Sequence, residues 1–350
     1  MTSLPARLLV DLPNWLGDFV HTLPALAALK SANRGGETTA LLPAAHAPLA
    51  RLLGVTAIVR PVGAGFGWSR RCVFGSFDVA LTARHSSRAK LLLAGTGTKT
   101  CLASEGRGAA ALGLVTFPVE RRHHQRHDLD GALKWLGLQP VSPAPFRLQL
   151  PEKLNRQGLR QRALMAELPG MVAFLPATRG SEDKRYPVRN FLAVAAELAE
   201  EGIAPLVMVG PGEERMATPF VTGVAAHVAP TVWPLHEIAA LLAACDAAVG
   251  NDSGLTHLAA VVGCPTIALF GPTDPARTAP VGGARVLQPP APVWGAAARL
   301  EDLDPADVLV AVRTMVATRP ELPCALASGV RSGVALETAQ RYDWAQRVGR

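Results

Sequence analysis

The sequence repeats one pattern from end to end: a short apolar run followed by a longer amphipathic stretch. This alternation predicts an α/β fold, with parallel sheets covered by helices on both faces. Strands are expected at 7–12, 37–43, 56–60, 77–82, 171–176, 204–210, 246–250 and 265–270. Helices are expected at 18–32, 86–94, 128–137, 152–167, 189–201, 235–244, 254–262 and 305–317.

The chain has 350 residues, enough for two domains that each bury a core. A proline-rich stretch at 140–151 is the candidate boundary. We therefore expect two doubly wound domains, 1–150 and 151–330, facing a central cleft at the carboxyl ends of their sheets. A last helix at about 333–347, within 331–350, is expected to pack back on the first domain or to fray.

Composition excludes several classes of protein. Hydrophobic residues make up 49% and charged residues 18%, which is typical of a globular chain. The longest apolar stretch, 258–270, is interrupted by Gly263 and Pro265 and is too short to span a bilayer. The apolar run at 8–10 stops at Asp11, unlike a signal peptide. A cytoplasmic location is expected.

The net charge indicates which classes of partner suit the chain, and the cysteine spacing indicates whether disulfides are expected. The formal charge of +7 favours an anionic partner such as nucleic acid, anionic lipid or a phosphorylated substrate, or is merely solubilising. Nucleic acid is disfavoured because the basic residues are spread out and not interleaved with aromatic residues. The five cysteines are scattered and lack C-x-x-C spacing, so they are expected to be reduced thiols.

The most informative segment, 246–275, reads as a strand, a tight polar turn, a helix and a second strand. Asp252 and Ser253 are good N-cap residues, and Gly254 permits close approach of the backbone to a ligand. A helix N-terminus presents unpaired N–H groups and a partial positive charge, which suits a diphosphate. The alternative is an ordinary βαβ unit in which His257 has only a structural role.

The runs D-S-G-L-T-H-L-A-A at 252–260 and G-C-P-T-I-A-L-F-G-P-T-D-P at 263–275 resemble a known signature. It is the donor-binding signature of the ADP-heptose:lipopolysaccharide heptosyltransferase family, glycosyltransferase family 9. The resemblance implies a GT-B fold, with two Rossmann-like domains facing a central cleft. It also implies that the nucleotide diphosphate is bound by Asp252, Ser253, Gly254, Leu255 and His257.

A second constellation lies near the N-terminus, where P-N-W-L-G-D-F-V occupies 13–20. A strand runs into a glycine-containing turn, and Asp18 falls in the first turn of a helix, where the dipole favours a carboxylate. A plain N-cap aspartate is the alternative. The run at 13–20 resembles the N-terminal signature of the same family, particularly that of members that add the second heptose. The resemblance implies that Asp18 is the catalytic base and that Asn14 and Trp15 bind the acceptor.

Weaker matches extend the resemblance on the acceptor side. The runs H-S-S-R-A at 85–89 and E-G-R-G at 105–108, with a histidine further on, are similar to family segments near the acceptor. The alternative is a helix start, a turn and a solvated basic patch at 121–127. No metal is expected at the histidines, because no carboxylate or thiol is spaced to complete a site. The resemblance implies acceptor binding by Ser86, Arg88, Arg107 and His124.

A strand followed by a polar loop is expected over 172–187, where the family pattern is P-G-[AST] followed by K-[RH]-W-P. This chain has P-A-T at 176–178 and K-R-Y-P at 184–187. The resemblance implies that Lys184 stabilises charge on the departing diphosphate and that Thr178 binds the donor. Ala177 replaces the usual glycine, which puts close approach of the backbone to phosphate in doubt.

Two further features concern specificity. After the strand at 204–210, one of the two glutamates Glu213 and Glu214 is the candidate for the ribose hydroxyls, with Glu213 favoured, or else the segment is a solvated helix start. Trp233 lies near the adenine-contacting segment of the family. Many relatives carry a cysteine-rich segment after residue 285, whereas 287–300 here contains prolines and no cysteine. Specificity for the donor or acceptor can therefore differ from that of the best-known members.

The resemblance implies an inverting transfer that needs neither a cofactor nor a metal. Asp18 removes a proton from an acceptor hydroxyl, the oxygen attacks the anomeric carbon of ADP-L-glycero-β-D-manno-heptose, and ADP departs against Lys184 and the helix N-terminus. The acceptor implied is the inner core of lipopolysaccharide, of the heptosyl-Kdo-lipid A type. Such an acceptor implies peripheral contact with the inner face of the cytoplasmic membrane.

Three alternatives differ in what they need. The same fold and chemistry could serve another sugar nucleotide or acceptor. A non-catalytic nucleotide-sugar binding protein would keep the 250–257 turn but would not need Asp18 and Lys184 together. A dinucleotide dehydrogenase would rest on the glycine-rich run at 63–67, which is not G-x-G-x-x-G and after which no helix is expected.

Overall fold

The computed structural model describes residues 4–165, 170–178, 182–290 and 299–319. The chain forms two compact units. Unit 1 comprises residues 1–148 together with 276–281, and unit 2 comprises 149–275 and the chain from 282 onward. The helix expected at 333–347, and with it the segment 331–350, lies outside the described residues.

Unit 1 is built on a six-stranded sheet in the order β3-β2-β1-β4-β5-β6, with all neighbouring strands parallel. The order in which the strands are added reverses between β1 and β4, and ligands bind at such a point in folds of this class. Its strands are β1 Arg7–Asp11, β2 Glu37–Leu42, β3 Thr56–Val59, β4 Val79–Thr82, β5 Thr100–Ser104 and β6 Val115–Phe117. Its helices are α1 Leu16–Ala32, α2 Ala47–Leu52, α3 Phe66–Cys72, α4 Ser87–Ala94 and α5 Asp130–Trp135, with 3₁₀ turns η1 Ala44–His46, η2 Ala110–Leu112 and η3 Gln125–His127.

Unit 2 repeats the plan with the strand order β12-β11-β10-β7-β8-β9, again all parallel. Here the reversal falls between β7 and β10. Its strands are β7 Gly170–Leu175, β8 Ile203–Val207, β9 His227–Val228, β10 Ala247–Asn251, β11 Thr266–Leu269 and β12 Arg285–Leu287. Its helices are α6 Glu152–Met165, α7 Val188–Glu200, α8 Thr218–Val224, α9 Leu235–Ala244, α10 Gly254–Val261 and α12 Pro305–Ala317, with η4 Glu182–Lys184, η5 Glu214–Met216 and η6 Leu300–Asp302; the short α11 Pro275–Thr278 spans the junction of the units.

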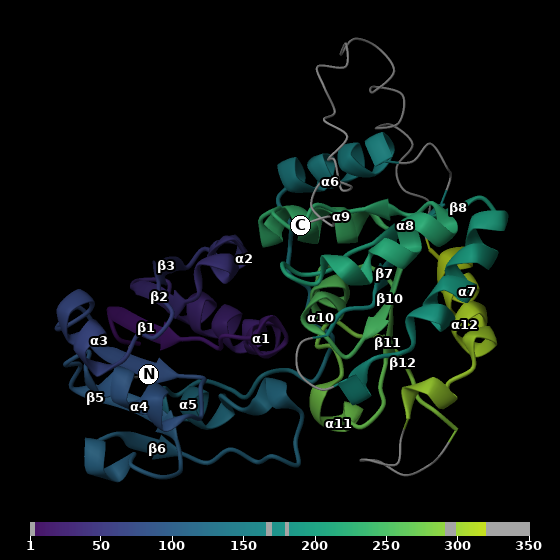
Figure 1. Ribbon diagram of the computed structural model, residues 1–350. Helices are drawn as coiled ribbons and strands as arrows, with labels where there is room; N and C mark the ends of the chain where they lie inside the picture. Colours follow the sequence, from purple (N-terminus) through teal and green to yellow (C-terminus); the bar gives the residue numbers. More distant parts are fainter. Residues whose placement is uncertain (1–3, 166–169, 179–181, 291–298, 320–350) are drawn as a thin grey trace. The chain divides into compact units, whose positions relative to one another are not determined.

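Burial explains why the central strands carry so few polar residues. Every residue of β7 and β10 is buried, because helices cover both faces of a parallel sheet. Helices α7 and α12 pack side by side along the sheet of unit 2, and α6 packs on α9 (Figure 1). Rings of Phe174, Phe191, Phe220 and Tyr186 meet within this core at centroid distances of 5.0–6.4 Å. The core thereby anchors Tyr186, two residues after Lys184.

The predicted α/β class is confirmed, and each expected strand and each expected helix up to residue 317 has a counterpart. The sequence did not indicate β5, β6, β9 and β12, which are short or carry polar residues, nor α2, α3, α8 and α11. The expectation that no helix follows the glycine-rich run at 63–67 was wrong, since α3 begins at Phe66. Among the described helices, none is both long and apolar enough to cross a membrane.

Close packing of α6 on α9 depends on a missing side chain, and this gives a prediction. A Cβ added at Gly158 would lie 2.1 Å from the main-chain oxygen of Ala240. Replacing Gly158 with alanine should lower the free energy of unfolding by about 2–4 kcal/mol, because the helices must move apart. Urea denaturation followed by circular dichroism measures the change.

The matched control is Gly223→Ala in α8, where the new methyl group would meet only a side-chain carbon at 3.7 Å. That substitution should be neutral or stabilise by up to about 1 kcal/mol, through helix propensity. Equal urea midpoints for the two variants would contradict the assigned packing.

Candidate functional site

Two loops of unit 2 meet at the point where the order of the strands reverses, between β7 and β10. One follows β7 and leads to Lys184, and the other follows β10 and contains Asp252 and Ser253. Because β7 and β10 are adjacent and parallel, their carboxyl ends lie at the same edge of the sheet. Residues far apart in sequence are thereby brought into contact.

Asp252 is the centre of this site. One carboxylate oxygen accepts hydrogen bonds from the Lys184 ammonium at 3.0 Å and the Thr273 hydroxyl at 2.8 Å. The other lies 3.2 Å from Nε2 of His257, a residue of α10. Thr178 approaches the main-chain oxygen of Asp252 at 3.5 Å. Four of the predicted donor residues therefore form one cluster, to which the structure adds Thr273.

The electrostatics of Asp252 are set by burial and by its partners. Its side chain is only 7% exposed, and burial alone would raise its pKa. The hydrogen bonds and charges of His257 and Lys184 outweigh burial and hold the pKa of Asp252 well below its ordinary value. The carboxylate therefore stays ionised, and Lys184, whose side chain is 30% exposed, stays near it while keeping access to solvent.

Asn251 links the loop after β10 to the loop after β7. Its fully buried side chain accepts a hydrogen bond from the Tyr186 N–H at 2.9 Å and donates to the main-chain oxygen of Pro176 at 2.7 Å. The Tyr186 hydroxyl in turn donates to the oxygen of Leu303 at 3.1 Å, and burial raises its pKa to about 12. The chain on both sides of Lys184 is thus fixed by buried bonds, which fixes where the ammonium can reach.

The N-terminus of α10 has the features of an anion site. Ser253 occupies the N-cap position, but its hydroxyl pairs with Thr256 at 3.3 Å instead of capping the helix. The first amides of a helix have no partner within the helix, so those of Gly254 and Leu255 remain available to a ligand. Gly250 is required beneath this turn, because a Cβ there would lie 2.5 Å from both Thr256 and Leu175.

Glu213 is positioned by its own turn. Its carboxylate accepts a hydrogen bond from the Gly210 N–H at 2.9 Å. The neighbouring Glu214 accepts from the Gly212 N–H at 3.1 Å and from the Thr231 hydroxyl at 3.2 Å. Both carboxylates help to shape the turn after β8, and ribose binding by Glu213 stays a prediction.

In unit 1 the turn after β1 carries the other predicted catalytic residue. Asp18 lies in the first turn of α1, half-buried, and its Oδ1 accepts a hydrogen bond from Nε2 of Gln125 at 2.9 Å. Trp15 is 59% exposed. Asn14 is also exposed, and its side-chain oxygen accepts a hydrogen bond from Arg60 at 2.6 Å.

The charge cluster beneath this turn was not predicted from the sequence. Asp11, at the end of β1, is fully buried and binds Arg60, Arg84 at 2.8 Å and the Thr82 hydroxyl at 2.8 Å. Arg60 also donates to the main-chain oxygen of Leu12 at 2.9 Å. An aspartate ending a buried strand was the signal available. The cluster fixes the path of the chain into α1, and with it the position of Asp18.

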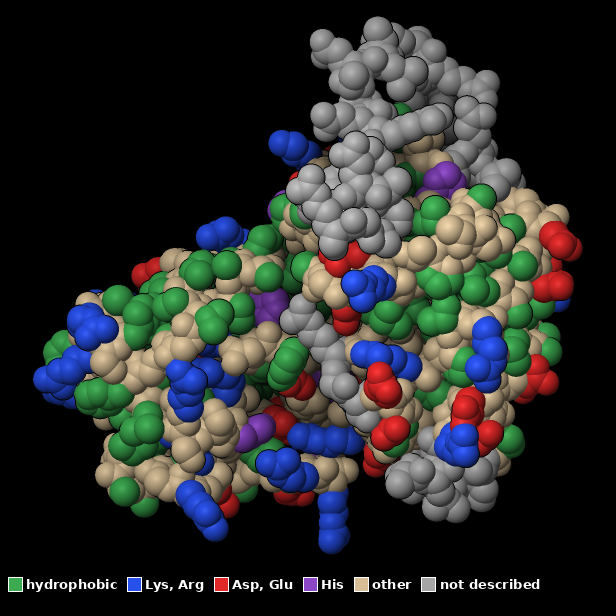
Figure 2. Space-filling model, in the orientation of Figure 1, with side chains coloured by type: hydrophobic (Ala, Val, Ile, Leu, Met, Phe, Trp, Pro, Cys, Tyr) green, Lys and Arg blue, Asp and Glu red, His purple; other side chains and the backbone are tan. Residues whose placement is uncertain are grey.

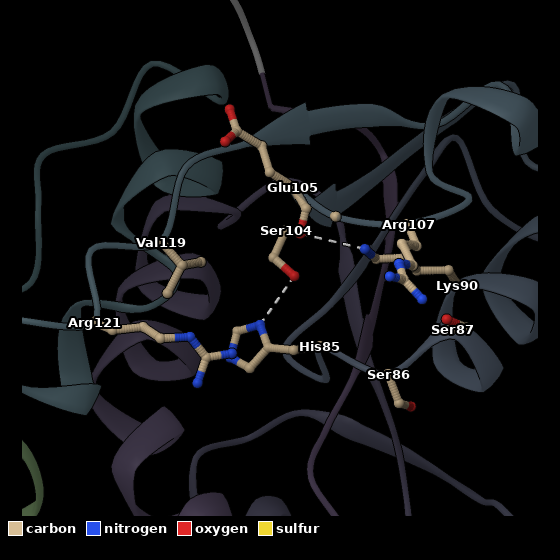
Figure 3. A pocket seen from close by; sticks show the side chains of 10 residues that line it. His85, Ser86, Ser87, Lys90, Ser104, Glu105, Arg107, Val119 and Arg121 are labelled. Atoms are coloured by element: carbon tan, nitrogen blue, oxygen red, sulfur yellow. Dashed lines mark hydrogen bonds between the residues drawn. The ribbon is translucent and has the colours of Figure 1, made fainter.

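A cavity of about 400 Å³ lies at the carboxyl ends of β4, β5 and β6 (Figure 3). The predicted acceptor residues Ser86 and Arg107 line it, as do Lys90, Arg121 and the pair His85–Ser104, joined at 2.9 Å. Lys90 is only 2% exposed, and its ammonium donates to the main-chain oxygen of Glu105 at 3.3 Å. Within the part of the chain that is described, this ammonium forms no ion pair.

The other two predicted acceptor residues have different surroundings. The guanidinium of Arg88 binds the main-chain oxygens of Gly63 and Ala64, so it holds the glycine-rich turn and does not line the cavity. His124 uses both ring nitrogens: Nδ1 accepts from the Arg126 N–H at 3.2 Å, and Nε2 donates to the oxygen of Ala279 at 2.7 Å. Burial lowers the pKa of His124 to about 4, so the ring is neutral near pH 7.

Two D-x-D runs, a pattern that can hold a divalent metal in glycosyltransferases, occur at 128–130 and 302–304. In the first, Asp128 binds Arg277 at 2.7 Å, and Asp130 binds His127 at 2.8 Å. In the second, Asp304 caps α12. No cluster of three or more metal-ligating side chains is found among the described residues.

The comparison with protein families bears directly on the donor-side cluster. The model of glycosyltransferase family 9 (heptosyltransferase) matches residues 70–287, which is more than half of the chain and includes Lys184, Asp252 and His257. The chain belongs to this family. Asp18 lies outside the matched range, so its role is not carried by this match.

Individual relatives agree with the family. Lipopolysaccharide heptosyltransferase 2 of Escherichia coli K12 is 32% identical over 151 residues, which is 41% of this chain and 42% of that protein. The chain thus aligns with only about two fifths of this relative's length. Lipopolysaccharide heptosyltransferase 1 of the same strain is 28% identical over 293 residues, or 77% of this chain and 89% of that protein.

The fold agrees as well. The solved structure of E. coli ADP-heptose lipopolysaccharide heptosyltransferase II superposes with a TM-score of 0.76 at 21% identity, covering 89% of this chain and 98% of that one. Family 9 membership and this superposition confirm the expected GT-B fold. Relatives of both heptosyltransferase types match, so they do not decide between the two transfer steps.

The depressed pKa of Asp252 gives a prediction about stability. Replacing Asp252 with asparagine should lower the free energy of unfolding at pH 7 by about 2 kcal/mol, less than for a fully buried ion pair because Lys184 reaches solvent. A group with a lowered folded pKa contributes this stability above about pH 4, its ordinary value, and loses it as the pH falls. The difference between the two proteins should therefore shrink below pH 4, as measured by urea denaturation at pH 7 and pH 3.

The matched control is Asp302→Asn, at an exposed aspartate of η6. It should change stability by less than about 0.5 kcal/mol at either pH. A loss in the Asp252→Asn variant that is equally large at pH 3 and pH 7 would contradict the electrostatic account.

Proposed function

We propose that this protein is an inverting glycosyltransferase that moves L-glycero-D-manno-heptose from ADP-heptose to the inner core of lipopolysaccharide. The observation that carries the proposal is the family 9 match, which spans the cluster of Lys184, Asp252 and His257 at the reversal point of a doubly wound sheet. The relatives that share this family are heptosyltransferases 1 and 2.

The donor half of the site suits a nucleoside diphosphate. The α10 amides of Gly254 and Leu255 face the diphosphate, and Lys184 meets the negative charge that develops as ADP leaves. Asp252 keeps the ammonium in place before the donor arrives, so little reorganisation is needed during the reaction. Fixed positive groups of this kind stabilise the leaving group without a metal ion. Glu213 is assigned to the ribose.

Asp18 is assigned as the general base. Its carboxylate lies in the first turn of α1, and one oxygen is held by Gln125, which leaves the other to accept a proton from the acceptor hydroxyl. The hydroxyl oxygen then attacks the anomeric carbon opposite ADP, and the new glycosidic bond forms as the bond to the diphosphate breaks. The reaction requires Asp18 and the bound donor to reach the same sugar.

The charge distribution supports an acidic acceptor bound by unit 1. Unit 1, residues 1–148 with 276–281, contains 18 lysines and arginines against eight aspartates and glutamates, whereas the rest of the chain contains 17 against 20. On the face drawn in Figure 2, basic side chains of unit 1 are numerous and acidic ones few. The cavity lined by Lys90, Arg107 and Arg121 would bind a phosphate or carboxylate of the glycolipid.

We assign the second heptose transfer rather than the first. The N-terminal run P-N-W-L-G-D resembles members that extend heptosyl-Kdo-lipid A. A lipid-linked acceptor implies that the protein works in the cytoplasm, peripherally at the inner face of the cytoplasmic membrane.

The test is a transfer assay with purified protein and defined acceptors. ADP-heptose is offered with Kdo-lipid A or with heptosyl-Kdo-lipid A, and products are identified by mass. A heptose added only to the second acceptor is the expected result, and addition only to the first would reassign the step. UDP-glucose and GDP-mannose, offered in parallel, test whether the Ala177 departure reflects another donor, and no product from any donor would overturn the proposal.

The Asp18 assignment yields a prediction about the rate. Replacing Asp18 with asparagine removes the base but keeps the shape of the side chain, so kcat should fall by about 10²- to 10⁴-fold. Thermal protection by ADP should persist, because the donor binds unit 2. Asp78→Asn, at a half-exposed ion pair with Arg7 in unit 1, is the control and should leave kcat unchanged. Near-normal turnover of the Asp18→Asn variant would exclude Asp18 as the general base.

The basic cavity yields a prediction about acceptor binding. Replacing Lys90 with methionine keeps the buried stem but removes the charge, so the KM for the glycolipid should rise by about tenfold while the KM for ADP-heptose is unchanged. The control is Lys99→Met, at an exposed lysine of the same unit. Equal KM values for the acceptor in both variants would exclude this cavity from acceptor binding.

A further inference from the structure

The half-buried side chain of Gln125 is the one group that the structure places on the Asp18 carboxylate among the described residues, at 2.9 Å. It comes from the 3₁₀ turn η3, which packs against α1. The preceding residue makes a second contact with the same helix: the ring of His124 meets that of His21, one turn after Asp18, at 5.3 Å and 62°. Two consecutive residues thus fix η3 on the face of α1 that carries the carboxylate.

The turn is itself fixed by a segment from far along the chain. Residues 276–281 belong to unit 1, although the chain before and after them belongs to unit 2. Arg277 forms a two-pronged ion pair with Asp128, with both contacts at 2.7 Å, and donates to the main-chain oxygen of His123, also at 2.7 Å. Ala279 accepts the hydrogen bond from His124. We call residues 276–281 the clamp segment.

The bonds of the clamp segment are well suited to hold a fixed geometry. Burial alone would raise the pKa of Asp128, but hydrogen bonds and charges of His85 and Arg277 outweigh it and lower the pKa. The aspartate therefore stays ionised and paired. The neutral ring of His124 uses one nitrogen as an acceptor and the other as a donor, which fixes its tautomer. Arg277 and Ala279 together grip both ends of the turn that carries Gln125.

We propose that Gln125 is a positioning residue for the general base and that Arg277 in the clamp segment holds Gln125 in place. A single N–H donor on Oδ1 sets the plane of the Asp18 carboxylate and leaves Oδ2 to receive the proton of the acceptor hydroxyl. Arg277 touches neither reacting group and acts through Asp128 and His123. The proposal rests on the transfer reaction proposed above.

The first experiment separates positioning from binding. Gln125→Leu removes the donor, and Gln125→Glu replaces it with an isosteric carboxylate that repels Asp18. Both should lower kcat by about 10- to 100-fold, because small errors in placing a reacting group are costly, with the KM for ADP-heptose unchanged. Gln149→Glu, at an exposed glutamine, is the control and should match the unmodified protein. A kcat within twofold of normal for Gln125→Leu, or a loss that appears only in the KM of the donor, would overturn the proposal.

The second experiment tests the clamp segment and does not depend on activity. Arg277→Met keeps the stem but removes the ion pair and the bond to His123. Hydrogen exchange should become faster in peptides covering 123–128 and the start of α1, and kcat should fall with the same pattern as in Gln125→Leu. Arg34→Met, at an exposed arginine of unit 1, should change neither. Unchanged exchange at 123–128 in Arg277→Met would overturn the role of the clamp segment.

The two experiments distinguish failure of the inference from failure of the proposed function. If the unmodified protein transfers no heptose, the proposed reaction fails. The structural half is then decided by exchange in Arg277→Met and by a double-mutant cycle on unfolding between Asp18→Ala and Gln125→Leu, because alanine removes the oxygen that accepts the Gln125 hydrogen bond. Additive effects in that cycle would show that the two side chains do not interact, and would overturn the proposal without any assay of transfer.

Discussion

The cluster of polar residues in unit 2 depends on one carboxylate kept ionised at the end of a buried strand. Asp252 is taken out of water by the fold and is compensated by Lys184, His257 and Thr273, which come from three different segments. Such an arrangement is stable only when every partner is present, because a lone buried charge is costly. The same carboxylate therefore orients the lysine, fixes the first turn of α10 and ties the loop after β11 to the loop after β7.

Unit 1 also contains a buried carboxylate that is paired with cations from neighbouring loops. Asp11 ends the central strand β1, and its buried carboxylate collects Arg60 and Arg84 from the loops after β3 and β4. In both units the aspartate binds a residue across the point where strand order reverses, Arg84 after β4 in unit 1 and Lys184 after β7 in unit 2. This is where a doubly wound sheet leaves room for a ligand. The difference lies in what is held. In unit 2 the cation itself faces the expected ligand, whereas in unit 1 the arginines hold the turn that presents Asp18.

The sequence predicts a part of the candidate site well when the residues of that part are contiguous in the chain. The turn at 252–257 is continuous in sequence, so its strand, glycine and helix start can all be recognised together. The contact between Lys184 and Asp252 could be inferred only through the family pattern, since it depends on β7 and β10 being neighbours. The burial of Lys90 was missed because a lysine on an amphipathic helix normally faces solvent, whereas here it is 2% exposed and its ammonium donates to the main-chain oxygen of Glu105 in the loop after β5. Arg88, two residues earlier, has the more suggestive position in the motif, yet it binds the main chain of the glycine-rich turn.

The clamp segment marks the limit of sequence reasoning most clearly. The run G-P-T-D-P continues into A-R-T-A-P without any break in composition, so nothing indicates that the chain leaves unit 2 after Pro275 and returns at Gly282. The return has a visible physical requirement, because a Cβ at Gly282 would lie 2.2 Å from the main-chain oxygen of Ala260. Thr273, which binds Asp252, and Arg277, which binds Asp128, are only four residues apart. A short stretch of chain therefore carries one contact to the Asp252 carboxylate and another to the turn that holds Gln125 on Asp18.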